Sequence, residues 1–151
     1  MRKLFTTFQV LALLLMAGAV TAQVRQITPD SARAMALAGE IVLIDIREPD
    51  EWAETGLPDV ALTAAMRSAD FIETLLNIRD QNPDIPLALI CQSGNRSSYM
   101  TGELHKAGLT NVIDVVEGMS GSRVGPGWAM RGLPMRRYNA PIHVAILTTQ
   151  P

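Results

Sequence analysis

The chemistry in this sequence centres on one residue. Cys91 is the only cysteine among the 151 residues, and it begins a short polar loop. The loop runs Cys91, Gln92, Ser93, Gly94, Asn95 and Arg96. The thiolate is the reactive form of cysteine, and a cationic neighbour or a helix N-terminus favours it. The pattern therefore predicts that Cys91 is a nucleophile.

The composition of the loop predicts an anion-binding cradle around the cysteine sulfur. Gly94 lets the backbone curl tightly, and Ser93 and Asn95 tolerate turn conformations. Such a loop can direct successive backbone N–H groups inward, and the positive end of a following helix adds to them. Arg96 adds a full positive charge. We expect this cradle to hold an anionic substrate or a negatively charged form of the sulfur.

A structural alternative is that Cys91 is an inert core residue at the end of a strand. That interpretation leaves the loop glycine and arginine unexplained, so we favour a reactive thiol. Ser97, where the next helix is predicted to begin, belongs to the same cradle. His105 and His143 are isolated and lack the spacing of metal ligands, so they are expected on the surface. We expect neither a metal nor a cofactor.

Two charged residues, Asp45 and Arg47, end an earlier apolar run. They could supply pocket charge near the cysteine loop, or they could form a structural network. In the second interpretation Arg47 pairs with a helix carboxylate such as Glu51 and pins the strand end. Because a partly buried arginine usually needs a partner, we favour the structural role.

Alternating strand and helix patterns predict the elements that position these residues. Continuous apolar runs, typical of strands buried in a parallel sheet, occur at 41–46, 87–90 and 112–116. Helical patterns occur at 29–38, 68–79 and 97–107, and a turn or helix begins at 48–50. The helical segment at 68–79 is expected to bury one face, formed by Phe71, Ile72, Leu75 and Leu76. Residues 142–147 could add an edge strand or pack as a tail. The fold class is therefore α/β with a parallel sheet.

The N-terminal residues 1–22 have the three-part pattern of a secretory signal peptide. Two basic residues precede a mostly apolar segment at 4–20, and Val20-Thr21-Ala22 offers a cleavage site. A transmembrane anchor is the alternative, but the apolar core is short for a span of about 20 residues. We expect cleavage after Ala22, with Ala19 as a weaker site, and a periplasmic or secreted protein. A domain at 23–135 and a C-terminal extension at 136–151 would follow.

Charge and cysteine usage narrow the class of partner. Without its predicted leader, which has two basic and no acidic residues, the chain keeps 11 basic and 15 acidic residues, a net charge of −4. This balance argues against nucleic acid or an anionic membrane as a partner.

Cysteines of exported proteins usually pair, and Cys91 cannot pair within its own chain. It is therefore a buried spectator, an intermolecular bridge or a working thiol, and the loop favours the last.

The sequence resembles the rhodanese family of single-domain sulfurtransferases across nearly the whole predicted mature chain. The matching motifs, in order, are Asp45-Ile46-Arg47-Glu48, Glu51-Trp52 with Gly56, Cys91 to Arg96, Glu117-Gly118-Met119, Gly127-Trp128 and Gly132-Leu133-Pro134. The resemblance implies a roughly five-stranded parallel sheet flanked by helices on both faces. It also implies that Cys91 attacks the sulfane sulfur of a small anionic donor such as thiosulfate. A thiol or cyanide then accepts the sulfur from the Cys91 persulfide.

The sequence departs from the family pattern in one segment. Many members have Gly-His-Ile-x-Gly-Ala where this chain has Gly56-Leu57-Pro58-Asp59-Val60-Ala61, so that side of the pocket is expected to differ. The spacing between Gly118 and Gly127 varies in the family, so the resemblance does not predict the shape of the pocket rim.

Two other functions compete with sulfur transfer. A cysteine phosphatase or an arsenate reductase of similar geometry needs five residues between its cysteine and arginine. Here four intervene, and Ser97 stands where the longer loop requires arginine, which disfavours this class. A persulfide carrier or sulfane-sulfur binding module with little turnover uses the same thiolate and stays an alternative.

Overall fold

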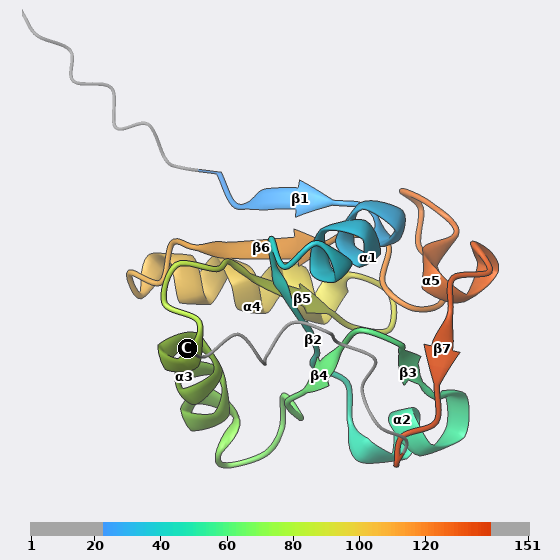
Figure 1. Cartoon of the computed structure of the whole chain (residues 1–151), viewed down its shortest axis with the longest axis horizontal. Coiled ribbons are helices and arrows are strands. Elements are labelled where there is room, and N and C mark those ends of the chain that lie inside the picture. Colours follow the sequence, from blue (N-terminus) through green and yellow to red (C-terminus); the bar gives the residue numbers. More distant parts are fainter. Residues whose placement is uncertain (1–22, 140–151) are drawn as a thin grey trace, which may run out of the picture.

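The computed structural model describes residues 23–139 of the chain. The predicted signal peptide, the possible strand at 142–147 and His143 lie outside these described residues. The remainder forms an α/β fold in which a parallel sheet lies between helices (Figure 1). The predicted fold class is therefore confirmed.

The main sheet has five strands in the order β1-β6-β5-β2-β4, and all its pairings are parallel. Its strands are β1 (Arg25–Ile27), β2 (Val42–Asp45), β4 (Leu62–Thr63), β5 (Leu87–Ile90) and β6 (Val112–Val115). The three central strands coincide with the predicted apolar runs, because residues buried on both faces must be apolar. A second, antiparallel pair joins β3 (Leu57–Pro58) to β7 (Met135–Arg136).

Five helices connect or cover these strands. They are α1 (Pro29–Leu37), α2 (Pro49–Thr55), α3 (Phe71–Gln81), α4 (Asn95–Lys106) and α5 (Gly127–Met130). Thr28 caps α1 as predicted, accepting a hydrogen bond from the Ser31 N–H (3.4 Å). Helix α3 begins at Phe71 rather than Ser68, and α4 begins at Asn95 rather than Ser97.

Two apolar clusters pack on opposite faces of the sheet. Helices α1 and α5 contribute Ala32, Ala36 and Trp128 to one cluster. Helices α3 and α4 contribute Phe71, Leu75 and Leu104 to the other. The sheet is therefore flanked by helices on both faces, as predicted.

The predicted apolar face of α3 is only partly correct. Phe71 and Leu75 are buried, but Ile72 and Leu76 are 48% and 37% exposed. Residues four apart share a face of a helix, so Phe71 and Leu75 turn inward together while Ile72 and Leu76 turn outward.

The parallel topology brings three chain segments to one edge of the sheet. Strands β2, β5 and β6 end at Asp45, Ile90 and Val115, and parallel strands share the edge at which they end. Ligands of open α/β sheets bind at this carboxyl edge. Cys91 follows β5 directly and therefore lies there. Over residues 23–139, no helix is long and apolar enough to cross a membrane.

Candidate active site

Cys91 lies between the end of β5 and the first turn of α4 and is 1% exposed. The turn depends on Gly94, which precedes α4 with a φ of +87°. A Cβ atom at this position would lie 2.0 Å from the carbonyl oxygen of Val116, so no larger residue fits. Only glycine is therefore tolerated at this position, both because of the positive φ and because of the close approach of Val116.

The cysteine sulfur contacts Ser97, the buried residue in the first turn of α4. The Ser97 N–H donates to Cys91 Sγ (3.4 Å), and the Ser97 hydroxyl oxygen lies 3.6 Å from the sulfur. The same hydroxyl donates to the Gly94 carbonyl (3.1 Å). Ser97 therefore belongs to the cradle through its backbone and its side chain.

The loop carbonyls are held away from the sulfur by the segment after β6. The Cys91 carbonyl accepts from the Met119 N–H (2.9 Å), and the Gln92 carbonyl accepts from the Ser120 N–H (2.8 Å). Within the described ranges, the backbone N–H groups of residues 92–96 have no acceptor. The loop therefore keeps several donors available for an anion at its centre.

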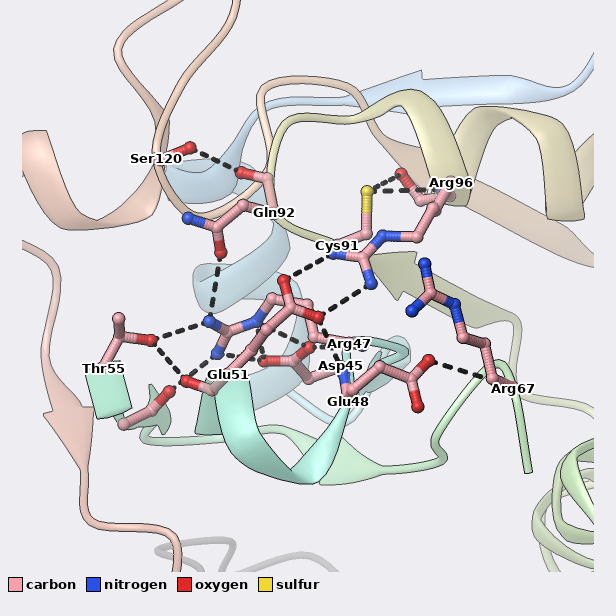
Figure 2. A network of polar contacts seen from close by, with 12 residues as sticks. Asp45, Arg47, Glu48, Glu51, Thr55, Arg67, Cys91, Gln92, Arg96 and Ser120 are labelled. Carbon is pink, nitrogen blue, oxygen red and sulfur yellow. Dashed lines mark hydrogen bonds and ion pairs between the residues drawn. The ribbon is translucent and has the colours of Figure 1, made fainter. Parts of the chain in front are cut away.

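Arg96 does not present a free charge to the cradle. Its guanidinium donates to Glu51 of α2 through two hydrogen bonds of 2.6 and 2.8 Å (Figure 2). These hydrogen bonds lower the pKa of Glu51 below its usual value. The predicted positive charge of Arg96 is thus neutralised, and the pair ties the cysteine loop to α2.

Arg47 is fully buried and forms an ion pair with Asp45 (2.8 Å). Burial raises the pKa of Asp45, and hydrogen bonds from Arg47 oppose that rise. Arg47 also donates to the Thr55 hydroxyl (2.7 Å) and to the Gln92 side-chain oxygen (3.2 Å). The prediction that Arg47 pairs with Glu51 was wrong, because Asp45 lies two residues away in the chain and accepts the hydrogen bonds of the guanidinium.

A third arginine, which the sequence analysis missed, faces the same region. The backbone N–H of Arg67 donates to Glu48 (3.1 Å), which precedes α2. Figure 2 shows the Arg67 side chain extending from the loop after β4 toward the Arg96 end of the site. In the part of the chain that the structure describes, no carboxylate pairs with its guanidinium. No sequence pattern marked Arg67, since its position depends on β4.

The remaining loop residues divide between two surfaces. The Gln92 side chain turns toward Arg47, while Ser93 and Asn95 line a cavity on the β1 side of the loop. The segment after β6 is fixed by Glu117, which accepts from the Gly127 N–H (2.9 Å) and from Arg131. His105 lies on α4, away from these groups in sequence and fold. Residues 23–139 contain no cluster of three His, Cys, Asp or Glu side chains able to hold a metal.

The structure therefore belongs to a class of α/β proteins in which a cysteine thiol lies in a strand-to-helix loop whose backbone N–H groups can bind an anion. The model of the Rhodanese-like domain family matches residues 28–123. The chain belongs to the rhodanese-like domain family.

Two curated relatives have sulfurtransferase names. The chain is 33% identical over 113 residues to thiosulfate sulfurtransferase 16, chloroplastic, of Arabidopsis thaliana, covering 70% of this chain and 87% of the relative. It is 31% identical over 91 residues to thiosulfate sulfurtransferase GlpE of Pseudomonas syringae pv. syringae (strain B728a), covering 60% and 79%. These similarities assign sulfurtransferase chemistry at the level of the family.

A solved structure has the same fold. The crystal structure of Rv0390 from M. tuberculosis superposes with a TM-score of 0.56 at 29% identity. The match covers 77% of this chain and 99% of that chain. Nearly the whole of that structure is therefore matched by the fold around Cys91.

Proposed function

We propose that the protein moves a sulfane sulfur from a small anionic donor such as thiosulfate to a thiol or cyanide. The sulfur is carried as a persulfide on Cys91. One observation carries the proposal: the Cys91 sulfur receives the Ser97 N–H inside a loop whose other N–H groups lack acceptors among residues 23–139. Such a cradle favours a thiolate before transfer and a persulfide anion after it.

In the first half-reaction the Cys91 thiolate attacks the outer sulfur of thiosulfate. A new S–S bond forms as the S–S bond of the donor breaks, and sulfite leaves with the electron pair. The N–H groups of residues 92–97 stabilise the charge that remains on the persulfide.

In the second half-reaction the acceptor attacks the outer sulfur of the persulfide. Its electron pair forms the new bond, and Cys91 leaves as the thiolate. Cyanide yields thiocyanate, and an acceptor thiolate yields its own persulfide. The two steps balance without an external oxidant or reductant, and neither requires a metal.

A phosphatase is disfavoured by the direction of Arg96. A phosphoryl group needs an arginine turned over the cradle, whereas Arg96 is held by Glu51 through a bidentate contact. The four-residue spacing between Cys91 and Arg96 argues in the same direction. Hydrolysis of p-nitrophenyl phosphate without any sulfur transfer would overturn the proposal.

A persulfide carrier with little turnover is the second candidate. It is favoured by the burial of Cys91, which is only 1% exposed and therefore hard for a large acceptor to reach. A carrier and an enzyme form the same persulfide and differ only in how fast the acceptor removes its sulfur.

Intact-mass measurement after incubation with thiosulfate tests the shared first step. We expect a gain of one sulfur atom, about 32 Da, that is absent from the Cys91→Ser variant and reversed by a reducing thiol. Ser97→Ala, which removes the hydroxyl but keeps the N–H, should still form the adduct. No adduct on the wild-type protein would refute both the enzyme and the carrier.

Thiocyanate production then separates the two candidates. An enzyme consumes its persulfide with cyanide repeatedly, so thiocyanate accumulates over many turnovers. A carrier gives up its sulfur to cyanide only slowly, so thiocyanate forms without a burst and stays below about one equivalent per protein over the same time. A steady rate that disappears in Cys91→Ser would establish turnover at this residue.

The proposal includes export to the periplasm or the exterior, with cleavage after Ala22. Support comes from the basic, apolar and small-residue segments of residues 1–22. Expression of the full chain in a bacterium, followed by fractionation and N-terminal sequencing, tests this step. A mature protein beginning at Gln23 is expected; an uncleaved chain in the cytoplasm would refute export.

A further inference from the structure

A cavity of about 600 Å³ lies on the β1 side of the cysteine loop. Residues 93–95 of the cysteine loop line it, together with Gln26 of β1 and Ser98 of α4. Asp114 of β6 and Arg123 of the following loop complete its charged lining. Cys91 does not line this cavity, so it is distinct from the sulfur site.

Asp114 is a buried carboxylate that sulfur transfer does not use. It is 1% exposed, and within the described ranges neither carboxylate oxygen has a partner in good hydrogen-bond geometry. Burial raises the pKa of Asp114, and the nearby side chains of Ser97, Ser98 and Gln26 only partly oppose the rise. All three of these neighbours are neutral, so no protein cation compensates the carboxylate.

Such a group is unfavourable for folding. An uncompensated buried charge costs several kcal/mol, and buried polar groups in native proteins normally have partners. Unpaired carboxylates with raised pKa values are enriched at ligand-binding and catalytic sites. Asp114 belongs to the lining of the cavity, where a bound cation would supply the missing partner.

Arg123 is the second charge that lines the cavity. Its side chain is exposed, and it has neither an ion pair nor a hydrogen bond to any of residues 23–139. It also does not pair with Asp114. The lining of the cavity thus includes one carboxylate and one guanidinium, and neither forms an ion pair within residues 23–139.

We propose that this cavity binds a small zwitterion, with its ammonium group on Asp114 and its carboxylate on Arg123. A simple cation would be repelled by Arg123, and a simple anion would be repelled by Asp114. A divalent metal is disfavoured because Asp114 is the one carboxylate in the lining, and metal sites need several oxygen ligands. Gln26 and Ser98 add neutral hydrogen-bonding groups for either end of the ligand.

The site adjoins the sulfur site but does not depend on its chemistry. Ser98 lines the cavity, while the preceding residue, Ser97, contacts the Cys91 sulfur. A bound zwitterion would therefore rest against the loop that carries Cys91. Binding requires neither the thiol nor a sulfur donor, so its failure would leave the proposed function untouched.

Amide NMR titration of the ¹⁵N-labelled protein without any sulfur donor tests the proposal. Because the span between the two charges of the ligand is unknown, three zwitterions of increasing length serve as probes: L-alanine, L-alanyl-L-alanine and 6-aminohexanoate. Ethylamine and propionate, which carry one charge each, are the matched controls. We expect saturable shifts of the Gly94, Asn95 and Val124 amides with at least one zwitterion, and at least tenfold weaker binding of both controls.

Two variants assign the contacts. Asp114→Asn and Arg123→Gln should each weaken the best zwitterion about tenfold or more, whereas Asp84→Asn, an exposed residue of similar charge, should not. Arg123 is exposed, so its variant remains informative even if Asp114→Asn fails to fold. No saturable shift with any probe, or equal binding by the wild type and Arg123→Gln, would overturn the proposal.

Discussion

At the scale of single residues, the arginines around Cys91 differ in how their charge is compensated. Arg47 is neutralised by a buried aspartate, and Arg96 is neutralised by Glu51. Arg67 has no carboxylate partner within residues 23–139 and extends toward the same site (Figure 2). Of these three arginines, Arg67 should therefore contribute most to the attraction of an anionic donor to the site.

Replacing Arg67 with glutamine should weaken donor binding without changing the chemical step. An exposed charge interacting with an anion is worth roughly 1 kcal/mol, so the KM for thiosulfate should rise about fivefold while kcat stays within about twofold. Steady-state kinetics at low salt measure both quantities. The difference between variant and wild type should shrink as salt screens the charge.

Arg79→Gln is the matched control for this prediction. Arg79 is an exposed arginine of α3 that pairs with its neighbour Asp80, so its loss changes the net charge equally. An equal rise in KM for both variants would show that only net charge matters and would contradict a specific role for Arg67.

The buried pair of Asp45 and Arg47 makes a prediction about stability. Arg47→Met removes the compensation of a fully buried carboxylate, which typically costs about 3–5 kcal/mol. Urea unfolding followed by circular dichroism measures the loss. Adding Asp45→Asn should restore much of it, because the second change removes the uncompensated charge. A single variant within about 1 kcal/mol of the wild type would contradict this account.

At the scale of elements, the turn from β5 to α4 determines the position of the sulfur. Gly94 has a positive φ and approaches Val116 so closely that a Cβ would meet its carbonyl oxygen at 2.0 Å. Met119 and Ser120 bind the loop carbonyls from the same segment. The loop and the segment after β6 therefore form one rigid unit behind Cys91.

Gly94→Ala should disrupt this unit. Strain at the left-handed position and the clash with Val116 together should destabilise the fold by more than about 2 kcal/mol. Persulfide formation should slow in the variant fraction that stays folded, which stopped-flow and mass measurements can follow. Gly102→Ala is the control: it lies within α4 with nothing near its Cβ position, so it should stabilise by up to about 1 kcal/mol. Similar effects of the two substitutions would refute the steric argument.

Elements with their own sequence pattern could be predicted, and elements defined by a distant partner could not. Strands β2, β5 and β6 are buried on both faces and are mostly apolar, with Asp45 and Asp114 as the exceptions. Strands β1 and β4 contain three and two residues and exist because β6 and β2 pair with them. The pair of β3 and β7 joins segments far apart in the chain, for which local periodicity carries no signal.

The site divides in the same way. The loop from Cys91 to Ser97 is continuous in sequence, so its glycine and turn residues could be recognised, although α4 begins at Asn95 rather than at the predicted Ser97. The contact of Arg96 with Glu51 joins residues 45 apart, and no local pattern specifies it. The need of a buried arginine for a partner suggested Glu51 of the following helix, but Arg47 pairs with Asp45 on the same strand end.

At the scale of the whole molecule, two apolar clusters stabilise the sheet from either side, and Asp114 interrupts one of them. Side chains alternate along β6, so Asp114 shares a face with Val112, which packs with Leu104 of α4. A carboxylate occupies a position where an apolar side chain would stabilise the fold. Its burial lowers the free energy of unfolding of the whole domain by an amount that depends on pH.

Asp114→Asn should therefore stabilise the protein in a pH-dependent manner. The pKa of Asp114 is raised in the folded protein above its ordinary value of 3.8, so the unfolded chain loses this proton first as pH rises. Above the raised pKa of the folded state, the ionised Asp114 lowers the free energy of unfolding. Below pH 3.8 both states hold the proton, and this destabilisation disappears. The variant should exceed the wild type by about 1 kcal/mol or more at pH 7 and approach it toward pH 3. Urea unfolding across this range measures the difference, with Asp84→Asn as a surface control. A constant difference at every pH would show that shape rather than charge is responsible and would contradict an ionised, uncompensated Asp114.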